Sequence, residues 1–352
     1  MNNNPIPTST SSDTDEIELF EEPLNISQHF EGASRIRCKD ENRLERILVP
    51  ICGDLMQEDL GLSYEDQETL ANEISIVFHC AATVKFDEAL RASIQMNVIG
   101  TQRLASLCRR MKRLKAFVHT STAYANCNKE YTSEHIYEPC VNASKLVEAT
   151  SWMNEKMLDS LSTQLLDNRP NTYTFAKALA ESQLLEQQKQ FPPLPIIIIR
   201  PSIVGAIWKE PLPGWIDNVN GPTGIFIGVG KGVLTDMCGN VDIKTDIIPV
   251  DIVANMLIAA AAYRAKIPLP DKKEENNEKG TMIPIIHCTS GELNPLKWRR
   301  FVKIYDKIWR MMETLHYFTT REWTFESNNA IKLWNGMSVE DKKAMRKINL
   351  KL

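Results

Sequence analysis

The chain has 352 residues, enough for one large domain or two modest ones with a sizeable core. Its 43% hydrophobic and 24% charged residues are ordinary for a globular protein, which excludes a chain that is disordered throughout. The net charge of -4 provides no overall positive field for a phosphate backbone, so the sequence does not favour nucleic acid as a partner.

Cysteine, histidine and apolar patterns narrow the class of protein further. The 8 cysteines include no Cys-x-x-Cys pair, which indicates a reducing, intracellular compartment. The 6 histidines show no spacing typical of metal ligands, so we expect no metal. The N-terminus carries no apolar signal region, and no apolar run reaches the roughly 20 residues that a membrane span needs. We therefore expect no transmembrane segment in this chain.

The order of the predicted elements indicates an α/β fold. Residues 1–40 are polar and acidic without a sustained period, which predicts a flexible leader. Apolar positions between residues 90 and 108 recur every three or four residues, as one face of a helix requires. Buried strands are predicted from β-branched runs at residues 46–51, 74–80, 115–120, 195–200 and 282–288. Alternating strands and helices predict a Rossmann-like, doubly wound parallel sheet whose ligands bind at the carboxyl ends of the strands.

Three segments follow the fourth predicted strand. Residues 208–246 are rich in Gly and Pro, and a loop of this length is commonly a lid or binding element. Residues 271–280 are charged and predict a solvated loop. Beyond residue 294 the pattern becomes helical, with an apolar stripe over residues 298–315 that predicts a core-facing helix in a small helical C-terminal region.

The sharpest chemical signal is Tyr173 and Lys177 in the helix predicted for residues 171–190. A spacing of four puts the phenol and the ammonium on one helix face. A neighbouring cation lowers the pKa of a phenol, and such a tyrosine can protonate an oxygen while hydride reaches the adjoining carbon. Alone the pair is weak, because a surface ion or cation-π neighbour explains it equally well.

Hydroxyl groups at the end of the third predicted strand support this interpretation. Thr120, Ser121 and Thr122 follow one another there and could hydrogen-bond a substrate carbonyl beside the phenol. Capping of the strand end is the alternative. Other strand ends carry Gly53-Asp54, the run His79 to Ala82 and the run 200–205, all expected around the same crevice.

These motifs together resemble a known family. Residues 77–126, the pair Tyr173 and Lys177, and residues 200–205, 221–224 and 248–251 resemble the extended short-chain dehydrogenases/reductases. More narrowly, they resemble the fatty acyl-CoA reductases of the male-sterility type, and residues 318–325 resemble the C-terminal domain of that family. The resemblance covers most of residues 42–335. It implies a reductase domain over residues 41–296 and a C-terminal domain over residues 297–352.

The resemblance implies two-step, NADPH-dependent reduction of long-chain acyl-CoA to fatty alcohol, as in wax biosynthesis. Tyr173 would be the proton donor, Lys177 its activator and a ligand of the nicotinamide ribose, and Thr122 or Ser121 the partner of the carbonyl. Asp54 would lie near adenine. The remaining positions implied to line the cofactor are His79, Ala81, Ala82, Asn97, Thr120, Pro201 and Ser202. By the same resemblance we expect the surface of the peroxisome or endoplasmic reticulum, and a homo-oligomer is a possible assembly.

The chain departs from the family in its glycine pattern. The family opens with a strand and a Gly-rich turn whose amides meet the pyrophosphate, and nothing here matches that turn. Before Gly53 the only glycine is Gly32, and the G-x-G stretch at residues 228–232 follows the fourth predicted strand. We therefore expect both domains to be truncated and the sheet to be N-terminally incomplete.

Without the first two strands of the family, the sheet has two possible arrangements, and two other functions are to be compared with acyl-CoA reduction. The strand at residues 46–51 either pairs directly with the strand at residues 74–80 or leaves an exposed sheet edge. The alternative function is a catalytically silent homologue that binds acyl chains or a full-length partner. A sugar-nucleotide enzyme of the same superfamily is disfavoured, because residues 318–325 have no role there.

Overall fold

The computed structural model describes residues 47–231, 233–234, 239–240, 242–269, 283–291, 293–298, 317–318 and 320–346. All elements below belong to the unit Leu48–Leu352. The predicted leader and the loop at residues 271–280 lie outside the described residues, as does the stripe at residues 298–315 apart from Trp298. The proposed boundary between residues 296 and 297 stays a prediction.

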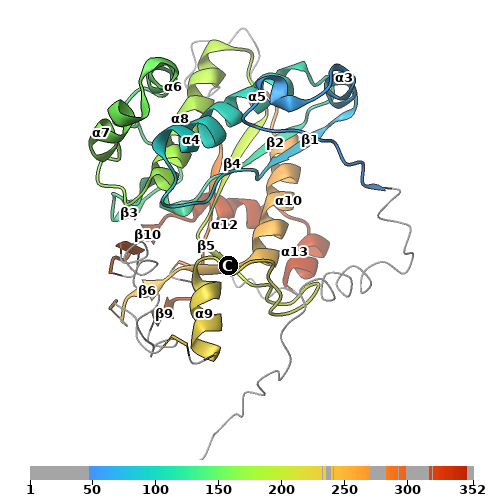
Figure 1. Ribbon diagram of the computed structural model, residues 1–352. Helices are drawn as coiled ribbons and strands as arrows, with labels where there is room; N and C mark the ends of the chain where they lie inside the picture. The colour runs from blue at the N-terminus through green and yellow to red at the C-terminus, as the bar shows by residue number, and fades with distance from the viewer. Residues whose placement is uncertain are drawn as a thin grey trace, which may run out of the picture. The chain divides into compact units, whose positions relative to one another are not determined.

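Four parallel strands form the central sheet (Figure 1). Their order is β1-β2-β4-β8, and each pair of neighbours is parallel. The bounds are β1 (Ile76–His79), β2 (Ala116–Thr120), β4 (Ile196–Pro201) and β8 (Ile285–Cys288). Four of the five predicted strands are therefore confirmed, and so is the α/β, Rossmann-like class.

The composition of β4 explains why it lies inside the sheet. Its four consecutive isoleucines are almost fully buried, and they point alternately to opposite faces. Ile196 and Ile198 pack with side chains of α5 and α8, whereas Ile197 and Ile199 pack with side chains of α10. Burial of each such side chain stabilises the fold by about 1.5–3 kcal/mol. A run without polar alternation therefore fits only a strand that is covered on both faces.

Two of the predicted helices are present in the described part of the chain. The predicted helix at residues 90–108 is α4 (Leu90–Ile94), a π-helical turn η2 (Gln95–Ile99) and α5 (Gly100–Arg110) in succession. The predicted helix at residues 171–190 is α8 (Thr172–Gln190), which begins where the Asn171 side chain accepts a hydrogen bond from the amide of Thr174 at 2.9 Å. Asparagine at this position satisfies one of the free amides of the first turn.

The remaining elements are short or lie around the sheet. Two short strand pairs are parallel, β3 with β10 and β5 with β7, and β6 pairs antiparallel with β9. The helices are η1 (Glu58–Gly61), α3 (Tyr64–Glu73), η3 (Ala123–Asn126), α6 (Ala143–Trp152), α7 (Glu155–Leu165), α9 (Pro222–Gly230), α10 (Val250–Lys266), α12 (Asn328–Asn335) and α13 (Val339–Arg346). The short strands are β3 (Tyr131–Thr132), β5 (Ile203–Gly205), β6 (Lys244–Thr245), β7 (Ile247–Pro249), β9 (Leu296–Lys297) and β10 (Thr324–Phe325).

The prediction of a strand at residues 46–51 is wrong for the described residues 47–51. They form no strand, and Val49 is 79% exposed. The reason is the absence of a partner among the described residues, because a β-branched run becomes a strand only where a ladder can form. β1 is consequently an edge strand, and its Phe78 is 45% exposed. Of the two structural alternatives, the structure has the exposed edge.

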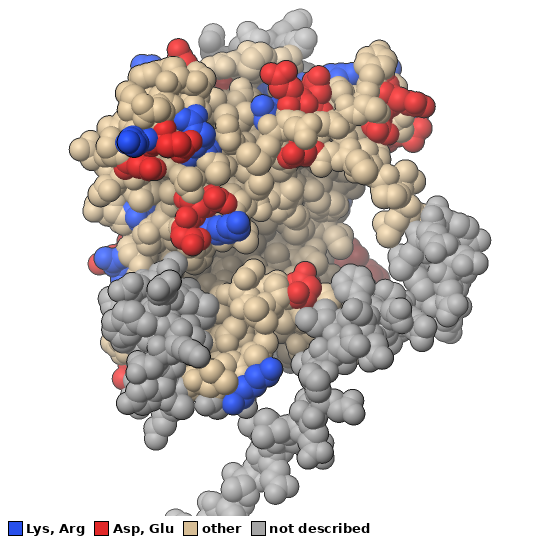
Figure 2. Space-filling view, viewed as in Figure 1, with Lys and Arg blue, Asp and Glu red and all other residues tan. Residues whose placement is uncertain are grey.

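The prediction of an irregular loop over residues 208–246 is also wrong in part. Within this range the structure contains α9 and β6, while residues 232, 235–238 and 241 lie outside the described part. Figure 2 shows the surface hollowed between the region that carries α4 and α8 and the region that carries α9. Among the described helices, none combines the length and the apolar character that a bilayer crossing requires.

Candidate active site

The site is built where β2 ends against the first turns of α8. Lys177 is only 4% exposed, and its Nζ donates a hydrogen bond to the carbonyl oxygen of Thr120 at 2.8 Å. This contact ties the second turn of the helix to the carboxyl end of the strand. Burial lowers the pKa of Lys177 to about 8, while Cys80 and Glu181 act in the opposite direction. The side chain is therefore mostly an ammonium at neutral pH.

Tyr173 lies one turn before Lys177 and is half-buried. Burial raises the pKa of Tyr173 to about 12, and a hydrogen bond with the Thr122 side chain acts in the opposite direction. The expected lowering of this pKa by the ammonium is not found. Lys177 engages a backbone carbonyl instead. Near pH 7 the phenol is protonated, which is the form that can donate a proton.

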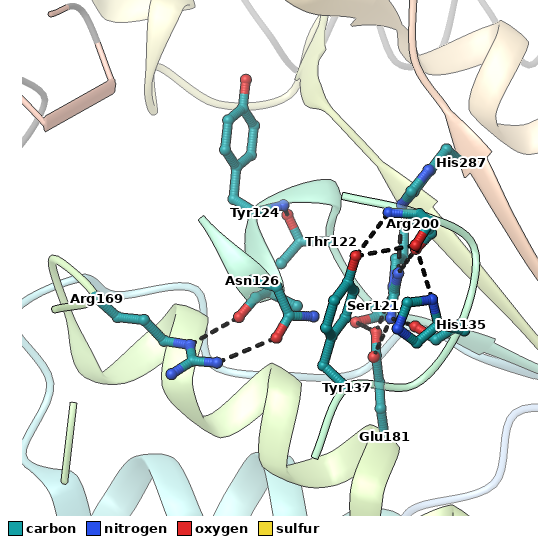
Figure 3. Close-up of polar contacts among 12 residues, drawn as sticks. Ser121, Thr122, Tyr124, Asn126, His135, Tyr137, Arg169, Glu181, Arg200 and His287 are labelled. Atoms are coloured by element: carbon teal, nitrogen blue, oxygen red, sulfur yellow. Dashed lines mark hydrogen bonds and ion pairs between the residues drawn. The ribbon is translucent and has the colours of Figure 1, made fainter. Parts of the chain in front are cut away.

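The structure separates the two candidate hydroxyl groups. The Thr122 hydroxyl accepts a hydrogen bond from the amide of Tyr124 at 3.3 Å and interacts with Tyr173. The Ser121 hydroxyl donates to Oε1 of Glu181 at 2.5 Å and is buried. In Figure 3, Ser121 lies beside Glu181 and Arg200, while Tyr124 points away from that group. Thr122 is thus the hydroxyl group beside the phenol.

A buried ion pair lies behind Ser121. Arg200 donates from Nη2 to Oε2 of Glu181 at 2.6 Å and from Nε to Oε1 at 2.9 Å. Both side chains are 1% exposed. Arg200 also donates to the carbonyl oxygens of Ser133 at 3.0 Å and His135 at 2.8 Å, so its guanidinium is engaged in contacts inside the protein.

Sequence reasoning missed Glu181. The signal was present, because Glu181 follows Lys177 by the same spacing of four that separates Lys177 from Tyr173. All three side chains therefore lie on one face of α8.

His79 is buried against a second histidine. Its Nδ1 lies 2.9 Å from Nδ1 of His119, its register partner on β2, and neither Nε2 has a hydrogen-bond partner among the described residues. Burial and the nearby Lys177 ammonium lower the pKa of His79 to about 3, so the ring is neutral. His79 therefore contacts its neighbour in the sheet, while the following Ala81 is exposed.

Asn97 fixes the loop that follows β1. Its Oδ1 accepts from the amide of Thr83 at 2.9 Å, and its Nδ2 donates to the carbonyl of Thr83 at 3.1 Å. Its side-chain amide therefore holds the loop that contains Ala81 and Ala82.

The nicotinamide end of a dinucleotide fits the residues present. Lys177 has two further N–H donors after its bond to Thr120, since an ammonium carries three. The hydroxyl of Ser202, next to Pro201 at the end of β4, is buried and has no hydrogen-bond partner in the part of the chain that the structure describes. These are donors of the kind that a ribose hydroxyl pairs with.

The described part of the chain contains no glycine-rich turn that could bind the diphosphate of a dinucleotide. A Cβ added to Gly53 would meet the Leu60 carbonyl oxygen and Cδ2 of Leu62, both at 3.1 Å, so this glycine is packed by its own loop. The exposed carboxylate of Asp54 accepts from the amide of Met56 at 2.8 Å and thereby stabilises the same turn. Neither Gly53 nor Asp54 contacts Tyr173 or Lys177 through these interactions. Metal-ligand side chains do not group in threes among the described residues either.

Two family models match the chain, and both are described as male sterility protein. An NAD-binding model matches residues 22–257, and a second model, named Sterile, matches residues 282–348. The first match begins inside the predicted leader, and the second begins before the predicted boundary at residue 297, so the predicted domain bounds stay a prediction.

The chain is similar to curated fatty acyl-CoA reductases. It is 37% identical over 355 residues to fatty acyl-CoA reductase 1 of Xenopus laevis, covering 84% of this chain and 66% of that protein. It is 35% identical to fatty acyl-CoA reductase 1 of Homo sapiens, covering 90% of this chain and 71% of that protein. The chain spans about two thirds of the length of these relatives.

Solved structures show the fold. The terminal R domain from the myxalamid PKS-NRPS biosynthetic pathway matches with a TM-score of 0.56 at 20% identity, covering 84% of this chain and 71% of that chain. A thiolation-reductase di-domain from an archaeal non-ribosomal peptide synthetase matches with a TM-score of 0.50 at 17% identity, covering 87% and 56%.

Proposed function

This chain belongs to the male-sterility-type fatty acyl-CoA reductases, a family of oxidoreductases, and on that premise we propose that it reduces long-chain fatty acyl-CoA to fatty alcohol with NADPH. A nicotinamide cofactor follows from the family; the choice of NADPH and of a long acyl chain is part of the proposal. The surface of the peroxisome or endoplasmic reticulum is the proposed location, and size-exclusion chromatography with light scattering tests the homo-oligomer.

The reaction consumes two hydrides and two protons. Addition of one hydride to the thioester carbon and one proton to its oxygen gives a hemithioacetal, which loses the CoA thiol to leave an aldehyde. Addition of a second hydride and a second proton gives the alcohol. When bound, the reduced nicotinamide supplies the hydride.

The side chains of this chain would handle the proton and the oxygen. Tyr173 donates its phenolic proton to the carbonyl oxygen, and the Thr122 hydroxyl hydrogen-bonds that oxygen from the neighbouring position. The Lys177 ammonium lies one helical turn from Tyr173 at the end of β2, and its remaining N–H donors would hold the nicotinamide ribose beside the phenol.

The observation that carries the proposal is the convergence of Thr122, Tyr173 and Lys177 at one strand end. A phenol at a surface ion pair would need neither the buried ammonium nor the contact from Lys177 to the Thr120 carbonyl at 2.8 Å. These contacts favour the catalytic interpretation over a silent homologue.

The test combines binding and turnover on the full 352-residue chain. Calorimetry with NADPH and NADH measures cofactor binding, and turnover of palmitoyl-CoA measures the reaction. Tyr173→Phe should reduce the rate by about 10²–10⁴-fold because general acid catalysis is lost. Tyr64→Phe is the matched control, since Tyr64 is 76% exposed. Full activity of the Tyr173→Phe protein would refute the role of Tyr173, and a folded chain that binds NADPH but reduces no acyl-CoA would refute the activity.

A further inference from the structure

The C-terminal segment described at residues 317–318 and 320–325 is attached to the loop that follows the candidate active site. The Tyr317 hydroxyl donates to the carbonyl of Cys127 at 2.7 Å, and Nε1 of Trp323 donates to the same carbonyl at 3.0 Å. β10 then pairs in parallel with β3. Because Cys127 follows η3 directly, and η3 follows Thr122, the segment lies beside the end of β2.

Aromatic rings connect this segment to the phenol of Tyr173. Phe318 contacts Tyr124 with ring centroids 5.0 Å apart and Phe86 with centroids 5.9 Å apart. Phe86 in turn lies 5.7 Å from the ring of Tyr173. These separations are those of ordinary aromatic pairs. The rings of Phe318, Phe86 and Tyr173 therefore form a continuous apolar path.

The rings of this path differ in solvent exposure. Phe318 is 8% exposed, whereas Phe86 and Tyr173 are half-buried. Phe86 thus presents apolar surface directly beside the phenol, and Phe318 fills the space behind it. The nearby Lys85 and Glu88 form an ion pair with each other at 4.0 Å rather than with the rings.

The chemistry of this surface matches an acyl chain. An aromatic face gains free energy by covering methylene groups, at about 0.8 kcal/mol for each CH₂ removed from water. The phosphates of CoA need cationic or amide donors, which the three rings do not supply. Only the acyl end of the substrate would gain from lying against Phe86.

We propose that Phe86 and Phe318 form the wall of an acyl subsite beside Tyr173, with Phe86 touching the first methylene groups of the chain and Phe318 positioning Phe86. The inference rests on the proposed function and deepens it. In this proposal the C-terminal segment helps to position the acyl chain of the substrate. The same role explains why residues 317–318 pack against the reductase part of the chain.

The test compares variants by the affinity for palmitoyl-CoA, octanoyl-CoA and free CoA, measured by calorimetry on the full chain. Phe86→Ala should weaken binding of both acyl-CoA ligands by about tenfold, which corresponds to about 1.4 kcal/mol. Phe318→Leu should weaken both by a smaller factor, because Phe86 stays in place but loses its support. Binding of free CoA should not change in either variant.

Phe325→Leu is the matched control. Phe325 is also 8% exposed and also contacts Tyr124, at 5.8 Å, but no contact with Phe86 is among its ring pairs. A merely structural role predicts equal effects of Phe318→Leu and Phe325→Leu on all three ligands.

The outcomes separate this inference from the proposed function. Equal acyl-CoA affinity in a folded Phe86→Ala protein and in the wild type would overturn the subsite, as would a wild-type chain that binds acyl-CoA no better than CoA. A wild type that binds acyl-CoA but does not reduce it would refute the activity alone, and the affinities would still decide the subsite. If Phe86→Ala does not fold, Phe86→Leu in the same assay decides it, with a loss of affinity expected for the acyl-CoA ligands only.

Discussion

Neutralising Glu181 is expected to destabilise the fold by about 3–5 kcal/mol. Glu181 and Arg200 are each 1% exposed and share hydrogen bonds of 2.6 and 2.9 Å. In Glu181→Gln the guanidinium would keep its positive charge inside the protein without the carboxylate that it binds directly. The backbone carbonyls that Arg200 also contacts are neutral, so they cannot replace the lost charge.

Ser121→Ala provides the control for the hydrogen bond alone. It removes the bond of 2.5 Å between the Ser121 hydroxyl and Glu181 but leaves the carboxylate charged. A typical intramolecular hydrogen bond contributes about 0.5–1.5 kcal/mol, and bonds to charged groups about 1.5–3 kcal/mol. Because glutamine keeps an oxygen that can accept from Ser121, a loss in Glu181→Gln above this range is assigned to the carboxylate charge.

Urea unfolding followed by circular dichroism measures both losses as shifts of the midpoint at constant slope. The double variant Glu181→Leu/Arg200→Met should be less destabilised than Glu181→Gln, because it leaves no unpaired charge. If Glu181→Gln costs no more than Ser121→Ala, the assignment of Glu181 as the counter-ion of Arg200 is refuted.

Three further outcomes follow from the same structure. Since the pKa of Lys177 is lowered to about 8, reductase activity should fall as the pH rises above about 8, and Lys177→Arg should move this limb of the pH profile upward by keeping the charge. Burial raises the pKa of Glu134 from 4.5 to about 7, so stability should decrease as the pH rises from about 4.5 to 7, and this slope should flatten in Glu134→Gln, measured by urea unfolding at several pH values. Phe117→Ala, at a fully buried position, should cost about 3–5 kcal/mol in the same unfolding assay.

The sheet could be predicted where burial alone decides the structure. The four isoleucines of β4 form a run that fits only a strand covered on both faces, and the prediction for residues 195–200 is confirmed. Residues 46–51 have a similar composition, yet the described part of this run forms no strand. Strand propensity is a property of one segment, whereas a strand forms only when a second segment pairs with it. The missing partner could therefore not be inferred from residues 46–51 themselves.

At the candidate active site, the spacing of Tyr173 and Lys177 predicted their shared helix face but not the groups that they contact. Tyr173 and Lys177 share a helix face as predicted, but the ammonium binds the Thr120 carbonyl and the phenol is desolvated, which reversed the expected pKa shift. The choice between Ser121 and Thr122 also stayed open, because neighbouring residues of a strand end differ in direction only once the chain is folded.

Helix α8 joins the buried ion pair to the candidate proton donor. Tyr173, Lys177 and Glu181 lie at successive turns of one face, and each contacts a different partner: Thr122 beside the phenol, the Thr120 carbonyl at the end of β2, and Arg200 at the end of β4. The two strands are neighbours in the sheet, so the Glu181–Arg200 pair fixes the helix along its axis relative to both. A rotation or slide of α8 that moved the phenol would also have to break a buried ion pair. The reactive end of the helix is therefore held by contacts one and two turns away, where substrate and water do not compete for them.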